Sequence, residues 1–122
     1  MVLGKVDFVG LRTNRLAEMV ALFRDVLAVP IVRRQGDLVG FKLADGTVLE
    51  LYGPAEEFHA FFTTGPVVGF RVANFDHVHR ALVEAGTPFL SETQRSDGLA
   101  WRHFCCPDGT IAEIIGPSAE RP

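Results

Sequence analysis

Residues 45–54 read Asp-Gly-Thr-Val-Leu-Glu-Leu-Tyr-Gly-Pro, and residues 108–117 read Asp-Gly-Thr-Ile-Ala-Glu-Ile-Ile-Gly-Pro. Both stretches hold Asp-Gly-Thr, a glutamate and Gly-Pro at the same places, and each follows a phenylalanine at the same distance (Phe41 and Phe104). Upstream, Phe-Val-Gly-Leu-Arg at 8–12 matches Val-Val-Gly-Phe-Arg at 67–71. Sequence that repeats in this order indicates repeated structure. The chain is therefore expected to contain two copies of one supersecondary unit.

The first copy contains a strand, a helix and three short strands. Residues 5–12 alternate and are rich in β-formers, which predicts a strand. Apolar residues at helical spacing predict a helix over 14–27, with an inward face of Leu16, Met19, Val20, Phe23 and Leu27. Pro30 ends this helix. Strands are expected near 30–35, 38–43 and 47–52, because Gly36 and Asp45-Gly46 mark the turns between them.

The second copy repeats this order. A strand at 66–72 precedes a helix near 75–85 whose inward residues are Phe75, Val78, Leu82 and Ala85. Gly86 and Pro88 end the helix, and strands are expected near 88–91, 98–106 and 110–115. The prediction is an α+β protein of 122 residues in one domain, made of two tandem βαβββ modules at 5–54 and 66–117. Residues 53–65 form the linker, and its Phe58, Phe61 and Phe62 are expected to cover the core or a dimer contact.

Composition limits the classes of function. Hydrophobic residues make up 48% of the chain, which is sufficient for a packed core, and the net charge is −3 with scattered Lys and Arg. A nucleic-acid surface needs clustered positive charge, so no nucleic-acid partner is expected. The N-terminus becomes charged too early for a signal peptide, and no apolar run approaches the ~18 residues of a membrane helix. We expect a cytoplasmic protein without a membrane partner, in which Cys105 and Cys106 remain reduced thiols.

Two motifs extend the comparison to a known family. Phe104 to Glu113 reads Phe-x-x-Pro-Asp-Gly-x-x-x-Glu, and the first predicted helix ends Phe-Arg-Asp-Val-Leu at 23–27. With paired βαβββ modules, this sequence resembles the vicinal oxygen chelate superfamily, which includes glyoxalase I, extradiol dioxygenases and bleomycin resistance proteins. The resemblance covers about residues 5 to 117. We expect the modules to form a curved mixed sheet, a cup for a small molecule, with the helices on its outer face.

In metal-using members of this superfamily, the ligands come from the first and last strand of each module, commonly a His and a Glu. These positions are Phe8 and Glu50 in the first module, and Val67 and Glu113 in the second. Phe and Val have no lone pair to donate to a metal. We therefore expect no cofactor. If a divalent metal does bind, the remaining candidate ligands are Glu50, Glu113 and His103.

Strand alternation predicts which side chains line the cup. On the first strands these are Phe8, Gly10 and Arg12, and then Val67, Gly69 and Arg71. On the last strands they are Val48, Glu50 and Tyr52, and then Ile111, Glu113 and Ile115. The residues between them are apolar, as a helix-covered face requires: Val9, Leu11, Leu49, Leu51, Val68, Phe70 and Val72. His103 lies two residues from Trp101 and Cys105, and a packed or hydrogen-bonded role is expected for it.

Two carboxylates in one cup need a positive neighbour or a raised pKa, and Arg12 and Arg71 are the expected neighbours. They either neutralise the glutamates or hold an anionic or carbonyl group of a ligand. The predicted ligand-binding residues are Phe8, Arg12, Tyr52, Val67, Arg71, Trp101 and His103. Histidines 59, 77 and 79 are expected to play no part in the site, with 77 and 79 solvated on the second helix.

The function expected first is binding of a small hydrophobic or aromatic molecule, with or without an anionic group, by a metal-free protein of the bleomycin resistance type. The alternative is an enzyme: a lyase or isomerase with Glu50 or Glu113 as its general base, or a dioxygenase-like protein with a rebuilt metal site. A weaker alternative is an accessory module that acts through a protein partner. The resemblance also implies a homodimer.

Overall fold

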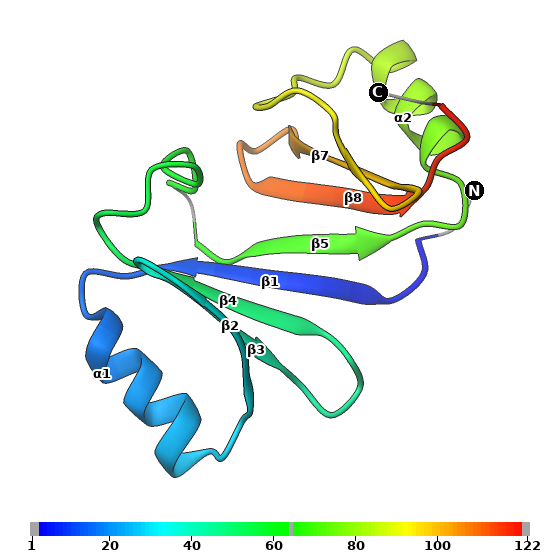
Figure 1. Ribbon diagram of the computed structural model, residues 1–122. Helices are drawn as coiled ribbons and strands as arrows, with labels where there is room; N and C mark the ends of the chain where they lie inside the picture. The colour runs from blue at the N-terminus through cyan, green and yellow to red at the C-terminus, as the bar shows by residue number, and fades with distance from the viewer. Residues whose placement is uncertain (1–2, 64, 121–122) are drawn as a thin grey trace. The chain divides into compact units, whose positions relative to one another are not determined.

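The computed structural model describes residues 3–63 and 65–120 and contains two consecutive βαβββ modules (Figure 1). The first contains β1 (Val6–Arg12), α1 (Leu16–Ala21), the π-helical turn η1 (Leu22–Val26), β2 (Ile31–Gln35), β3 (Leu38–Lys42) and β4 (Val48–Tyr52). The second contains β5 (Val67–Arg71), α2 (Phe75–Glu84), β6 (Gln94–Ser96), β7 (Leu99–Cys105) and β8 (Ile111–Pro117). The predicted α+β class and the tandem modules are confirmed.

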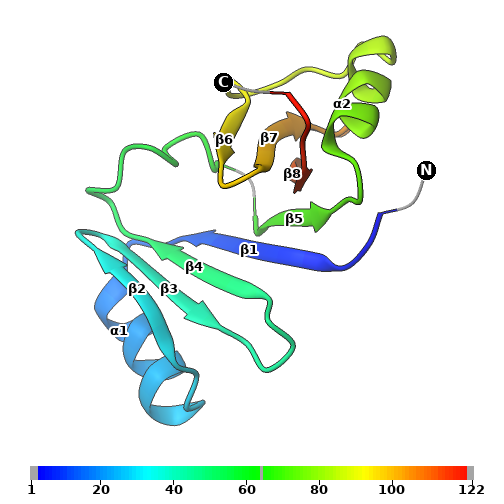
Figure 2. The same cartoon turned by 45° about the vertical axis from the view of Figure 1, so that its right-hand side comes forward.

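The described chain divides into two compact units. The N-terminal unit is residues 8–67, and the C-terminal unit is residues 3–7 and 68–120. Strands follow the order β2-β3-β4-β1 in the first unit and β5-β8-β7-β6 in the second (Figure 2). In both units the first and last strands pair in parallel, and the other pairs are antiparallel. Each unit therefore has the same four-stranded topology.

The register of the strands repeats as well. Glu50 lies between Gly10 and Gly40 on the neighbouring strands. Glu113 lies between Gly69 and His103 in the same way. The two glutamates therefore occupy equivalent positions, and Gly40 of the first unit corresponds to His103 of the second.

The repeated Asp-Gly-Thr forms the same turn twice. Asp45 Oδ1 accepts the backbone N–H of Thr47 at 2.9 Å, and Asp108 Oδ1 accepts that of Thr110 at 3.0 Å. The glycine that follows each aspartate has a positive φ, 89° in the first turn and 88° in the second, which glycine adopts without strain. The hydrogen bond from Thr110 also lowers the pKa of Asp108. The same Asp-Gly-Thr turn therefore precedes β4 and β8 at equivalent positions of the two modules.

In the N-terminal unit α1 lies beside one face of the sheet (Figure 1), and the hydrophobic core is formed between them. The strand residues in this core are those that alternation assigned to the helix side: Val9, Leu11, Val39, Phe41, Leu49 and Leu51. From the helix come Leu16, Met19, Val20 and Phe23. The inward face predicted for this helix is confirmed for these four residues.

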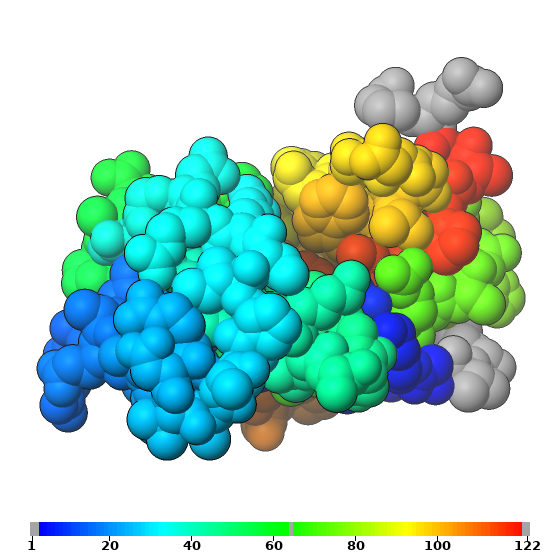
Figure 3. Space-filling view, turned by 60° about the horizontal axis from the view of Figure 1, so that its bottom comes forward, coloured from blue at the N-terminus to red at the C-terminus, as the bar shows by residue number. Residues whose placement is uncertain are grey.

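Leu27 is an exception, because 54% of it is exposed. A π-helical turn separates it from α1, and its N–H bonds the carbonyl of Leu22, five residues back. The extra residue in this turn rotates the next part of the chain away from the sheet. The surface of α1, η1 and β2, blue to cyan in Figure 3, also exposes Leu22, Val26 and Val32.

The C-terminal unit packs α2 against its sheet through Phe75, Val78 and Leu82, with Ala100 and Ile114 on the strands. The side chain of Asn74 caps α2 by accepting the N–H of His77 at 3.1 Å. The prediction of a strand at 88–91 is wrong. This segment forms only a bridge from Phe89 to Phe104, with backbone hydrogen bonds from Leu90 to His103 and from Cys105 to Pro88, and β6 lies later, at Gln94–Ser96. The pairing ends at Ser91, whose carbonyl accepts from Arg102 Nε at 2.7 Å.

Within the described residues, no helix has both the length and the apolar character needed to cross a membrane.

Candidate ligand-binding site

In each unit, one face of the sheet packs against the helix and contributes to the hydrophobic core. We call the opposite face of that sheet the far face. On the C-terminal unit, the strand register arranges this face in rows. Trp101, Ile115 and Arg71 form one row across β7, β8 and β5, and His103, Glu113 and Gly69 form the next. Rows of one face are about 7 Å apart along the strands, and neighbouring strands are about 5 Å apart. The predicted residues Trp101, His103, Glu113 and Arg71 therefore share one surface.

His103 and Glu113 are in direct contact at the centre of this face. His103 Nε2 lies 2.9 Å from Glu113 Oε2, and the two residues are only 3% and 6% exposed. The packed role expected for His103 fits this burial. The sequence did not indicate that its partner is Glu113.

Arg71 has a different partner from the expected glutamate. Its Nε and Nη2 both approach Asp7 Oδ1 at 3.3 Å, and its side chain is 36% exposed. A guanidinium has five N–H donors in a planar fork, so one carboxylate oxygen occupies only part of it. Arg71 therefore remains a charged group at the edge of the far face that can bind a second acceptor.

In the N-terminal unit, the equivalent carboxylate is held by other groups. The Tyr52 hydroxyl donates to Glu50 Oε1 at 2.7 Å, and Arg33 Nη1 lies 3.8 Å from Glu50 Oε2. Glu50 therefore has two partners within its own unit, and one of them, Arg33 of β2, was not singled out by the sequence.

The far face of the N-terminal unit is filled by the linker segment Glu56–Phe62. Phe62 is 4% exposed and lies edge-on to Tyr52, with ring centroids 5.4 Å apart. A Cβ at Gly10 would meet the rings of Phe8 at 2.7 Å and of Phe62 at 2.8 Å. The sequence left open whether Gly10 admits a ligand or relieves crowding. The structure shows that it relieves crowding by aromatic rings.

Polar contacts hold the linker segment in place. Arg12 donates to the carbonyl of Glu56 at 3.0 Å, so its guanidinium contacts the linker rather than Glu50. Glu56 also lies 3.0 Å from His59 Nδ1, and the His59 ring stacks on Tyr52 at 4.2 Å between centroids. His59 therefore belongs to the packing of this face, which its linker position did not reveal.

The residues present do not fit the metal site that the resemblance implies. Phe8 and Val67 replace two ligands with hydrocarbon, and Tyr52 and Arg33 already engage Glu50. Among residues 3–63 and 65–120, no group of three or more His, Cys, Asp or Glu side chains could hold a metal ion. His103 and Glu113 alone give two donors, fewer than the three that a catalytic zinc site takes from the protein.

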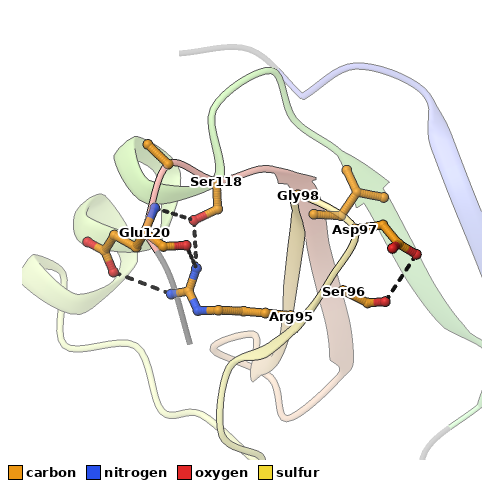
Figure 4. Close-up of a pocket in the computed structure, with 8 residues that line it drawn as sticks. Arg95, Ser96, Asp97, Gly98, Ser118 and Glu120 are labelled. Atoms are coloured by element: carbon orange, nitrogen blue, oxygen red, sulfur yellow. Dashed lines mark hydrogen bonds and ion pairs between the residues drawn. The ribbon is translucent and has the colours of Figure 1, made fainter.

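A separate hollow of about 340 Å³ lies beside the C-terminal tail of the same unit (Figure 4). Arg95 lines this hollow. The Arg95 guanidinium donates to Ser118 Oγ at 2.6 Å and lies 3.3 Å from Glu120 Oε2. Ser118 in turn donates to Asp76 on α2 at 2.7 Å, which is the main cause of the lowered pKa of Asp76. These contacts fasten the tail to the unit, and the hollow contains none of the predicted site residues.

His79 of α2 is not the solvated residue that its sequence position indicated. Its ring stacks on Phe75 at 5.2 Å, and its Nε2 lies 3.0 Å from Arg102 Nη1. Arg102 also lies over the ring of Phe89, 3.9 Å from its centroid. Since arginine can only donate, His79 Nε2 is the acceptor. Burial first, and then the charge of Arg102, lowers the pKa of His79 below 6.5.

This lowered pKa predicts a pH dependence of stability. The unfolded chain takes up a proton at His79 more readily than the folded chain, so stability rises with pH. The contribution is complete above about pH 6.5 and is lost as the pH falls through the lower folded pKa. We expect the melting temperature to fall from pH 7.5 to 5.5, and to fall less in His79→Gln. His77→Gln, at an exposed position of α2, should keep the wild-type dependence; equal slopes in all three proteins would contradict the prediction.

Both cysteines are free thiols, as expected, and burial raises the pKa of the Cys106 thiol.

Four residues that contribute to the two far faces could not be identified from the sequence: Asp7, Arg33, Glu56 and His59. Each lies outside the repeated motifs, and Asp7 adjoins Phe8 without any pattern of its own. The signal that could have found Glu56 and His59 is their three-residue spacing in an aromatic-rich linker.

No protein-family model and no curated protein sequence matches the chain. Solved structures do match it. A glyoxalase/bleomycin resistance protein/dioxygenase superfamily member from Vibrio splendidus 12B01 is 18% identical, with 94% of this chain and 99% of that chain covered and a TM-score of 0.69. Methylmalonyl-CoA epimerase from Mycobacterium tuberculosis is 19% identical, with 94% and 89% covered and a TM-score of 0.67.

A third structure, named as NAD-dependent benzaldehyde dehydrogenase from Legionella pneumophila, is 16% identical, with 90% and 97% covered and a TM-score of 0.63. Two of these names denote different activities and the other denotes only a superfamily, and one fold can support many activities. At these identities the likeness establishes the fold, which agrees with the duplicated strand register of this chain. The chain has the paired βαβββ fold of the vicinal oxygen chelate superfamily.

Proposed function

We propose that this protein binds a small molecule on the far face of its C-terminal unit, without a divalent metal. The observation that supports this most is the buried contact between His103 and Glu113, 2.9 Å apart, on the face that also holds Trp101 and Arg71. Burying polar groups is costly unless they bond each other or a ligand. A sheet centre with such a pair, flanked by an indole and a guanidinium, has the polar anchors typical of a ligand site.

The surrounding side chains suggest the class of ligand. Trp101 offers an aromatic surface and Ile115 an apolar one, and Arg71 follows them in the same row about 10 Å from Trp101 across two strand spacings. Arginine binds carboxylates through paired N–H donors. The ligand is therefore a small aromatic or apolar molecule with an anionic group, of the size of an arylacetate.

Two further observations support a metal-free site and a single ligand face. Phe8 and Val67 supply no metal ligand, and Phe62 of the linker occupies the far face of the N-terminal unit. In this proposal Phe8, Tyr52 and Arg12 support the linker, and Glu50 is a structural anion. The homodimer implied by the resemblance stays a prediction, for which light scattering after size exclusion is the measurement.

The proposal is tested by binding of phenylacetate, followed through the fluorescence of Trp101, which is the chain's single tryptophan. Saturable quenching is expected in the presence of EDTA. Arg71→Gln should weaken binding about tenfold, the loss of one charge-assisted contact of about 1.5 kcal/mol. Arg34→Gln, an exposed arginine of β2, is the matched control and should bind like the wild type.

Other outcomes would count against the proposal. A requirement for added Zn²⁺, Mn²⁺, Ni²⁺ or Fe²⁺ would contradict the metal-free site. Equal binding of phenylacetate by Arg71→Gln and by the wild type would show that Arg71 is not part of the binding site. The absence of saturable quenching by phenylacetate and by benzoate would contradict the ligand class.

A further inference from the structure

We propose that Asp7 is a positioning residue of the ligand site. It holds the Arg71 guanidinium in the orientation that binds a carboxylate, and it thereby makes the site selective for carboxylates over neutral analogues. The inference rests on the proposed function, because Arg71 is the anion-binding group of that same face. Asp7 lies on β1 and belongs to the C-terminal unit, as the other residues of 3–7 do.

The first argument is the edge of the guanidinium that Asp7 contacts. Nε and Nη2 of Arg71 both lie 3.3 Å from Asp7 Oδ1. These two nitrogens form one edge of the planar group, and Nη1 and Nη2 form a second edge with its own pair of N–H donors. A ligand carboxylate that accepts two parallel N–H···O bonds therefore binds at the Nη1–Nη2 edge. This edge suits a planar group with two acceptor oxygens.

The second argument is that backbone hydrogen bonds hold the segment with Asp7 beside Arg71. The N–H of Gly4 donates to the Arg71 carbonyl at 2.7 Å, and the Arg71 N–H donates to the carbonyl of Lys5 at 2.9 Å. A Cβ on Gly4 would lie 2.9 Å from the Arg71 carbonyl oxygen, so the two segments approach closely. Residues 4–7 thus hold both the backbone and the side chain of Arg71.

The third argument concerns the energy of the contact. The Asp7 side chain is 17% exposed and that of Arg71 is 36% exposed, and an ion pair with this exposure adds little to folding stability. Its effect is expected in binding instead. A mobile arginine loses rotamer freedom when it binds a ligand, and this loss weakens binding. An arginine that Asp7 already holds has lost that freedom before the ligand binds.

The duplication shows that the fold does not require this carboxylate. The residue of the second module equivalent to Asp7 is Pro66, which has no side-chain acceptor. The arginine equivalent to Arg71 is Arg12, which donates to the Glu56 carbonyl at 3.0 Å and lies 3.7 Å from the Glu56 carboxylate. Arg12 is therefore held by the linker. The carboxylate of Asp7 accompanies the arginine on the proposed ligand face.

The test compares phenylacetate with its neutral analogue phenylacetamide, both followed through the fluorescence of Trp101. Asp7→Asn should weaken phenylacetate binding about fivefold, because Arg71 must then be immobilised by the ligand. Binding of phenylacetamide should not change, because a single acceptor oxygen does not need the paired donors. Charge alone predicts the opposite sign, since removing a negative charge near the site strengthens the binding of an anion.

Asp97→Asn is the matched control, because it removes an exposed carboxylate of the same unit at the turn between β6 and β7. It should bind both compounds like the wild type. Asp7→Glu keeps a carboxylate within reach of Arg71 and should restore phenylacetate binding. In the unliganded wild type, the ¹⁵N order parameter of the Arg71 Nε–H should exceed about 0.6, the value below which a group is flexible. This measurement needs no variant, so it remains informative if Asp7→Asn does not fold.

The possible results separate this inference from the proposed function. Failure of the wild type to bind phenylacetate overturns both. If the wild type binds it and Asp7→Asn binds it equally well or more tightly, only the positioning role of Asp7 is overturned. Equal losses for phenylacetate and phenylacetamide also overturn that role, because they indicate general damage to the site. A flexible Arg71 Nε–H in the unliganded protein, or Asp7→Glu binding no better than Asp7→Asn, overturns it as well.

Discussion

Gly116→Ala is expected to destabilise the protein by about 3 kcal/mol or more, at the upper end of what overpacking costs. A Cβ on Gly116 would clash with the carbonyl oxygen of Val72, 2.2 Å away, and would lie 2.9 Å from its Cγ2. The closest atom belongs to the backbone just beyond β5, so a rotamer change cannot relieve the clash. Strand β8 must shift against β5, and this shift disturbs the register that places Glu113.

Thermal unfolding measures this effect, with a fall in melting temperature of about 10 °C expected for a chain of this length. Gly65→Ala is the matched control, because a Cβ at Gly65 meets nothing within 4 Å. It should melt close to the wild type. A Gly116→Ala protein as stable as Gly65→Ala would mean that β8 and the segment after β5 do not approach each other this closely.

The second large effect is expected at the linker. Phe62→Ala should lower the free energy of unfolding by about 3 kcal/mol, a typical loss for a buried aromatic ring. Phe62 is 4% exposed, and it contacts Tyr52 and lies next to Gly10. Truncation leaves a cavity in the far face of the N-terminal unit. It also removes a ring that packs beside the His59 ring, 5.0 Å away between centroids.

Phe58→Ala provides the comparison for this effect, because Phe58 is 61% exposed in the same segment. Its cost should stay within about 0.5 kcal/mol, as for most surface substitutions. Urea unfolding of the three proteins gives the two differences. Equal losses for both phenylalanines would contradict the packing of the linker on this face. Phenylacetate binding should survive in Phe62→Ala if the ligand uses the C-terminal unit alone.

The effect expected at Gly116 shows what one of the repeated residues does. The glycine of each Gly-Pro lies in a crowded place: a Cβ at Gly53 would meet Asp37 Oδ2 at 2.5 Å, as one at Gly116 meets Val72. The repeat in the sequence identified these two positions, but it did not explain why each of them is a glycine. The structure supplies the reason, which is close approach at the end of the last strand of each module.

Most of the fold could be predicted from local patterns. Alternation along residues 8–12 and 47–52 separated the helix side from the far side correctly, because strand geometry alone decides it. Helix spacing identified the inward face up to Phe23. The prediction was wrong at Leu27, where a π-helical turn changes the periodicity, and at 88–91, where the segment pairs with β7 through a single bridge.

The sequence by itself determined the duplication, the βαβββ order, the sheet face of each glutamate, and the presence of Trp101, His103 and Arg71 on the strands that carry them. These features depend on short-range periodicity and on turn chemistry. Only the tertiary structure decided which side chains contact each other. Glu50 is held by Tyr52 and Arg33, Arg12 by Glu56, Arg71 by Asp7, and His103 contacts Glu113. Apart from Tyr52 and Glu50, these pairs join residues from different segments, and their choice depends on strand register and on where a linker packs.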